Sequence, residues 1–171
     1  NIGSSTATVY LADGTTETYA ACTNPSGSDY ATVPEGPYHA KVGMHKGAYT
    51  ALRMEDTDGS GRIELGYENP AYTDGRTYAA GINIHKPGEN NLTGLTVKKR
   101  PISAGCLLID INSWNRFIGH FEAEDQKNNT VSVTVSRSLS EPVNVNRLPA
   151  FNFILNGTRE SFFSRIKNRK L

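Results

Sequence analysis

The feature that most constrains this fold is a series of short segments in which side chains alternate, each ended by turn-forming residues. Residues 6–11 and 15–22 follow this pattern and are separated by Asp13-Gly14, a dipeptide typical of tight β-turns. Residues 130–136 alternate strictly between valine and hydroxyl-bearing side chains. A period of two is that of a half-buried strand, so we expect a β-rich chain that opens with a hairpin.

Further strands are predicted where apolar runs lie between loops rich in Gly, Pro, Asp and Ser. Residues 51–54 and 62–65 flank the turn sequence Asp58-Gly59-Ser60-Gly61 and predict another hairpin. The remaining predicted strands are 38–42, 77–85 and 105–109, of which the last two are apolar enough to be buried.

Helical signals are confined to two short segments. Asp110 is a candidate N-cap for a helix over 111–118, whose apolar residues would share one face, and Gly119 would end it. A second short helix is predicted over 160–166, followed by a basic end. Because no linker or repeat divides 171 residues, we expect a single domain over 1–171. Its predicted class is mainly β, a sandwich or barrel with one or two short helices.

Charge and composition argue against several classes of partner. Eighteen Lys and Arg against 17 Asp and Glu give a net charge of +1, and there is one Trp, so no nucleic-acid partner is expected. The apolar runs are far shorter than the roughly 20 residues of a membrane-spanning helix, so no membrane span is expected. Two cysteines outside a CxxC pair indicate neither a disulfide scaffold nor a metal pair.

Residues 56–64 resemble the start of an EF-hand calcium loop, but the pattern then fails. Tyr67 stands where the loop needs its bidentate Glu, and no amphipathic helix precedes the segment, so a hairpin turn is favoured. No zinc-hydrolase pattern is present either. His39, His45 and His120 are therefore expected at the surface or packed behind the residues of a site, and no metal is predicted.

Cys106 and His85 form the strongest candidate site. His85 ends one apolar segment and Cys106 begins another, so neighbouring strands joined by the excursion 86–100 could bring the two side chains together. A cysteine becomes a nucleophile when a nearby imidazole takes its proton. The small residues Ala104 and Gly105 would let the backbone turn tightly, with amides free to stabilise an oxyanion.

The same residues carry a resemblance to a known family. His85, the spacer 86–102 and Ser103-Ala104-Gly105-Cys106 resemble the signature of the L,D-transpeptidase catalytic domain, the YkuD-like family. Residues 32–38 resemble that family's Thr-Pro-x-Gly-x-Tyr/Phe turn. The similarity covers roughly residues 7–135 and leaves the C-terminal segment unexplained.

The resemblance implies an L,D-transpeptidase-like β-sandwich or barrel with a Cys–His site that acts on peptidoglycan stem peptides. It gives the role of nucleophile to Cys106 and that of base to His85, with Ser103, Ala104 and Gly105 as the loop that shapes the site. Members often hold the histidine with a backbone carbonyl in place of a carboxylate.

Two positions depart from the family pattern. Leu108 stands where members commonly have Arg or Asn, and Ala104 stands where they often have His. Lys98, Lys99 and Arg100 are close in sequence and are candidates to replace the missing positive charge.

The function expected from the resemblance is cysteine-dependent acyl transfer on peptidoglycan stem peptides, as an L,D-transpeptidase or L,D-carboxypeptidase. Two alternatives remain open: a catalytically inactive relative that binds the cell wall or a partner protein, and an envelope-directed toxin or phage-derived protein with the same chemistry. The acyl chemistry needs no cofactor. We expect a monomer in the periplasm or cell envelope, its leader removed.

Overall fold

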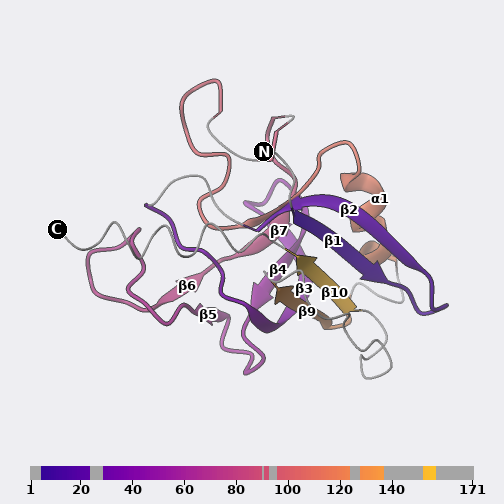
Figure 1. The fold of residues 1–171 in the computed structure, drawn as a ribbon, viewed down its shortest axis with the longest axis horizontal. Coiled ribbons are helices and arrows are strands. Elements are labelled where there is room, and N and C mark those ends of the chain that lie inside the picture. Colours follow the sequence, from indigo (N-terminus) through magenta and orange to yellow (C-terminus); the bar gives the residue numbers. More distant parts are fainter. Residues whose placement is uncertain are drawn as a thin grey trace.

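The computed structural model describes residues 5–23, 29–89, 91–92, 96–123 and 128–136, together with the backbone of 152–156. The described residues form ten strands and one helix, so the mainly β class predicted from the sequence is confirmed (Figure 1). The strands are β1 (Ser5–Tyr10), β2 (Thr16–Cys22), β3 (Gly36–His45), β4 (Tyr49–Glu55), β5 (Arg62–Glu64), β6 (Tyr78–Ala80), β7 (Asn83–His85), β8 (Leu107–Ile109), β9 (Val131–Ser136) and β10 (Asn152–Asn156), and the helix is α1 (Trp114–Glu122).

Eight of these strands form a closed barrel in the order β1-β10-β9-β3-β4-β7-β8-β2, and β2 pairs with β1 to complete the ring. The β1–β2 pair is the predicted opening hairpin, with Thr8 opposite Thr18. Strand β9 also lies where strict alternation predicted it, and its three valines are buried. The neighbours β7–β8 and β10–β9 are parallel, and the other pairs of the ring are antiparallel.

The predicted hairpin between 51–54 and 62–65 is wrong. Strand β4 pairs with β3 on one side and with β7 on the other, so neither of its edges is open to β5. Strand β5 pairs instead with β6, in a separate two-stranded sheet. The chain does reverse between β4 and β5, where the carboxylates of Asp56 and Asp58 accept backbone N–H groups of Glu64 and Ser60.

The apolar run 77–85 forms two strands instead of one. It breaks at Gly81, whose φ of +71° is a left-handed conformation that favours glycine. Before the break, β6 belongs to the small sheet, and after it, β7 belongs to the barrel. The break therefore leads the chain from the small sheet into the strand that carries His85.

One continuous core fills the barrel and extends under α1. The inward side chains of the barrel strands pack with the helix residues Trp114, Phe117, Ile118 and Phe121, all nearly inaccessible to solvent. The helix is therefore amphipathic in the way predicted, but it begins and ends later than expected. Ser113, not Asp110, is the N-cap, and Gly119 lies inside the helix. Burial of Phe121 beyond it outweighs the cost of a helical glycine, about 1 kcal/mol.

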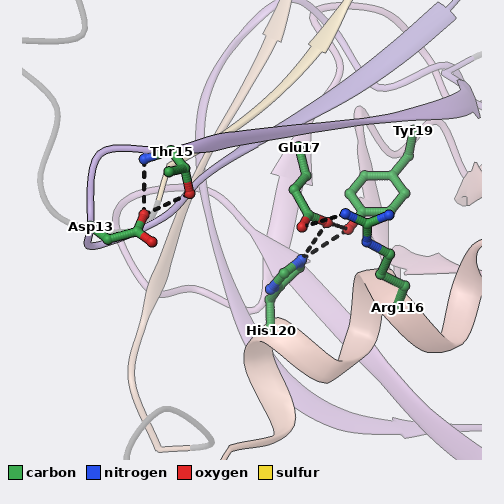
Figure 2. A network of polar contacts seen from close by, with 6 residues as sticks. All are labelled: Asp13, Thr15, Glu17, Tyr19, Arg116 and His120. Carbon is green, nitrogen blue, oxygen red and sulfur yellow. Dashed lines mark hydrogen bonds and ion pairs between the residues drawn. The ribbon is translucent and has the colours of Figure 1, made fainter.

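A polar network fastens α1 to β2 (Figure 2). The carboxylate of Glu17 accepts a hydrogen bond from Arg116 at 2.7 Å and another from the hydroxyl of Tyr19, and it lies 3.0 Å from His120 Nε2. The ring of Tyr19 meets Phe117 edge-on, with centroids 5.4 Å apart. His120 thus contributes to the contact between α1 and β2, which joins the helix to the part of β2 that contains Glu17 and Tyr19.

The second predicted helix, 160–166, and the basic end that follows lie outside the described residues. Within the part of the chain that the structure describes, no helix has the length and apolar character needed to cross a membrane.

Candidate active site

His85 is the last residue of β7, and Cys106 directly precedes β8, the parallel neighbour of β7. Ile84 pairs with Leu107 and His85 pairs with Leu108, so the sequence-based expectation that these two segments lie side by side is confirmed. The backbone N–H of Asn83 lies 3.4 Å from Cys106 Sγ, which donates in turn toward the carbonyl of Gly81 at 3.9 Å. Because side chains alternate along a strand, His85 and Cys106 point away from the core that Ile84 enters.

The turn that presents Cys106 requires a glycine at position 105. Gly105 has a φ of +111°, and a Cβ added to it would lie 3.1 Å from the carbonyl oxygen of Ala31 and 3.5 Å from Ile82 Cδ1. Ser103 is buried and its Oγ donates a 2.6 Å hydrogen bond to the carbonyl of Cys106. Both residues therefore fix the backbone on either side of Ala104; the role in a site that the resemblance gives them remains a prediction.

Cys106 is a half-buried thiol. Burial raises the pKa of the Cys106 thiol. The hydrogen bond from the Asn83 amide and the charge of Lys46 lower the same pKa, but by less. No disulfide joins it to Cys22, and both residues are thiols. The resting sulfur is thus protonated at neutral pH, which agrees with its position as a donor toward Gly81.

His85 is held by a backbone carbonyl. Its Nδ1 lies 2.6 Å from the carbonyl of Lys86, and since a carbonyl only accepts, Nδ1 carries the hydrogen and Nε2 keeps the lone pair. The hydroxyl of Tyr49 lies 3.2 Å from the same Nδ1 and donates to the same carbonyl at 3.1 Å. Burial lowers the pKa of His85 to about 4, with the neighbouring His45 as the next cause. At neutral pH the ring is an uncharged base.

Cys106 and His85 are therefore both uncharged in the resting protein at neutral pH. Among the described residues no hydrogen bond joins Cys106 Sγ to His85, whose described hydrogen bonds run from Nδ1 to Lys86 and Tyr49. Such a pair can still act by general base catalysis, in which the thiol proton moves to Nε2 while the sulfur attacks.

Tyr49 contacts the candidate base and was missed by sequence reasoning, whereas His45, expected at the surface or behind site residues, packs against His85. They come from the β3–β4 hairpin, where His45 is opposite Tyr49 and the turn between them contains Lys46 and Gly47, both with positive φ. Lys86 places its ammonium 4.9 Å from the centre of the Tyr49 ring. The sequence His-Lys-Gly-Ala-Tyr has no pattern that links it to His85, since the contact exists only because β4 pairs with β7.

The departure at position 108 has a structural reason. Leu108 is 1% exposed and belongs to a second apolar cluster with Cys22, Leu92 and Ile102, which packs the excursion after β7 against the barrel. An Arg or Asn there would have to be buried in this cluster. The exposed residues Lys98, Lys99 and Arg100 have no described contact with Cys106, so their predicted role as replacements remains a prediction.

A cavity of about 230 Å³ lies beside the loop that leads to Cys106. Ala104 lines the cavity together with Ala80 and Ile82. These two residues flank Gly81, whose carbonyl oxygen contacts Cys106 Sγ. Its other lining residues are Tyr30, Ala31, Asn69, Ala71, Tyr72 and Ala79. Within the described ranges no group of three His, Cys, Asp or Glu side chains is placed to bind a metal ion.

Comparison with known proteins gives no match: no family model, no curated protein and no solved structure matches this chain.

Proposed function

We propose that this protein is a cysteine acyltransferase that acts on peptidoglycan stem peptides through a thioester on Cys106. The observation that carries the proposal is the parallel pairing of β7 with β8, which brings Cys106, directly before β8, next to the strand that ends in His85. The carbonyl of Lys86 that fixes the tautomer of His85 supports it, because the free Nε2 is the nitrogen that a general base needs.

In the first step Cys106 Sγ attacks the carbonyl that precedes the terminal D-Ala of the stem. A sulfur–carbon bond forms, the carbon–nitrogen amide bond breaks, and the thiol proton passes through His85 Nε2 to the leaving amine of D-Ala. In the second step water or the side-chain amine of another stem attacks the thioester and restores the thiol. Water makes the protein an L,D-carboxypeptidase, and an amine makes it an L,D-transpeptidase. A substrate of this kind implies action in the cell envelope.

The test is incubation of the purified protein with disaccharide-tetrapeptide, followed by separation and mass measurement of the products. We expect free D-Ala with either the tripeptide or a cross-linked dimer. Cys106→Ala and His85→Ala should abolish both products. Cys22→Ala is the matched control, because it removes the other buried thiol outside the proposed machinery and should leave the products unchanged. An intact tetrapeptide after incubation with the folded wild-type protein would refute the proposal.

A second candidate is an inactive relative that binds the cell wall or a partner protein. It is favoured by the raised thiol pKa of Cys106 and by the burial of Leu108 where the family commonly has a polar residue. In that case the incubation with disaccharide-tetrapeptide gives no product, and a separate sedimentation assay shows the protein retained on insoluble peptidoglycan.

A further inference from the structure

The ring of His45 is stacked on the ring of His85. The two centroids are 4.0 Å apart and the planes differ by 19°, and the Tyr49 ring packs against His45 with centroids 5.4 Å apart. His45 is 8% exposed and His85 is 7% exposed. The ring proposed as the base is thus covered on one side by a second imidazole.

The strand register makes room for this stack. Gly43 pairs with Ala51, and the adjoining pair of Leu52 with Ile84 puts Ala51 between Gly43 and His85 on the outer face of the barrel. A glycine and an alanine at these positions leave space above the sheet for the two rings. Ala51 is fully buried although it faces outward, which agrees with coverage by larger groups.

Hydrogen bonding at the Nδ1 atom of His45 does not explain the burial of its ring. Its Nδ1 is buried and has no hydrogen-bond partner among the described residues. A buried polar atom without a partner is costly, and an apolar ring would pack in the same place without that cost. The described contacts of the His45 ring are its stack on His85 and its packing against Tyr49, so covering these rings is the role that the structure shows for an aromatic side chain here.

We propose that His45 is a positioning residue for the acyl transfer, which holds the His85 ring face-on, keeps water from it and so keeps its Nε2 as a free base. The inference rests on the proposed function. The described charged and titratable groups around the stack are Tyr49 from β4, Lys46 from the turn after β3, Lys86 after β7 and Cys106 before β8.

Burial and nearby charge lower the pKa of His85 by more than the hydrogen bond to the Lys86 carbonyl raises it. Burial lowers the pKa of His45, and Lys46 lowers it further; His45 and Lys46 in turn add to the effect of burial on His85. A His85 that stays neutral down to a pH of about 4 is ready to accept a proton over the whole neutral and mildly acidic range. Without the covering ring, water reaches His85 and its pKa returns toward the usual value of 6.5.

The experiment is an NMR titration of the histidine Cε1–H signals in the full chain, which needs no substrate. The variants are His45→Ala, which removes the ring, His45→Phe, which keeps a stacking ring, and His45→Gln as a polar replacement without a ring. His39→Ala is the control, because His39 lies on the same face of β3 six residues earlier. Signals are assigned with His85→Gln.

In the wild type and in His39→Ala we expect His85 to titrate near pH 4, and in His45→Phe to remain well below its usual range. In His45→Ala and His45→Gln its midpoint should move upward toward 6.5. The acid limb of kcat/KM on disaccharide-tetrapeptide should move with it, with about a tenfold loss near pH 5.5 if the shift is complete. KM should change little, since His45 is not expected to contact the substrate.

An unchanged His85 titration in His45→Ala or His45→Gln, with the wild-type fold retained in the amide spectrum, would overturn the inference. If His45→Ala does not fold, the comparison of His45→Phe with His45→Gln still shows whether the titration of His85 depends on an aromatic ring at position 45. A wild type that titrates as expected but releases no D-Ala would refute the proposed function and leave the effect of the stack on His85 established. Turnover whose pH profile is the same in all variants would leave the function standing and refute the positioning role.

Discussion

Replacement of Gly105 by alanine is the sharpest test of the turn that presents Cys106. With φ at +111°, position 105 has a backbone conformation that side chains rarely adopt, and strain of this kind costs on the order of 1–3 kcal/mol. The new Cβ would also lie 3.1 Å from the carbonyl oxygen of Ala31, a backbone atom that has to move with its loop. Overpacking adds about 1–3 kcal/mol, so we expect Gly105→Ala to lose roughly 2–6 kcal/mol of unfolding free energy.

Urea unfolding at neutral pH measures this loss, and Gly119→Ala is its matched control. Gly119 lies inside α1, and a Cβ there would meet no heavy atom within 4 Å. Alanine is a better helix former than glycine, so the control should gain about 0.5–1 kcal/mol. The same substitution is thus expected to have opposite effects at the two positions. A loss below about 0.5 kcal/mol in Gly105→Ala would refute the reasoning, because such a value is typical of a surface position without strain.

Three further perturbations test other parts of the structure. Ser103→Ala removes the 2.6 Å hydrogen bond to the Cys106 carbonyl, and urea unfolding should show a loss of about 1–3 kcal/mol. His85 has a folded pKa of about 4 against an unfolded value near 6.5, so its contribution to stability is complete above pH 6.5 and is lost as the pH falls toward 4; this contribution is at most about 3 kcal/mol. Denaturant midpoints measured between pH 7 and pH 4 should therefore fall less steeply in His85→Gln than in the wild type, and equal slopes would contradict the lowered pKa. Arg116, then Tyr19 and His120, lower the pKa of Glu17 to about 2, so its stabilising effect is present above pH 4.5 and fades toward pH 2. Thermal unfolding should show Glu17→Gln to be less stable than the wild type at pH 7, with the difference shrinking in acid; a difference independent of pH would argue against this network.

Local patterns predicted the parts of this fold that depend on neighbours in sequence. The β1–β2 hairpin, β9 and the apolar face of α1 follow from alternation, a turn dipeptide and helical spacing. The prediction of a hairpin after β4 was wrong because strand pairing depends on the whole chain. Both edges of β4 pair with other strands, β3 and β7. The prediction that the helix ends at Gly119 was wrong, because burial of Phe121 stabilises a helix that continues to Glu122.

The candidate site divides in the same way. Cys106 and His85 could be proposed from the sequence because Cys106 begins one apolar segment and His85 ends another. In the parallel pairing of β7 with β8, Cys106 lies beside Asn83, two residues before His85. Tyr49 and the contact between His45 and His85 could not be predicted, since both depend on the pairing of β4 with β7. No spacing in the sequence encodes that register, which depends on how the barrel closes.

The most direct test of a nucleophilic Cys106 is the intact mass of the protein within seconds of mixing with disaccharide-tetrapeptide. A thioester intermediate adds the mass of the muropeptide less its terminal D-Ala, and peptide mapping should locate the added mass on Cys106. The wild type and Cys22→Ala should carry this adduct, and Cys106→Ala should not. Turnover without an adduct on Cys106, or an adduct that persists in Cys106→Ala, would show that another group attacks the peptide.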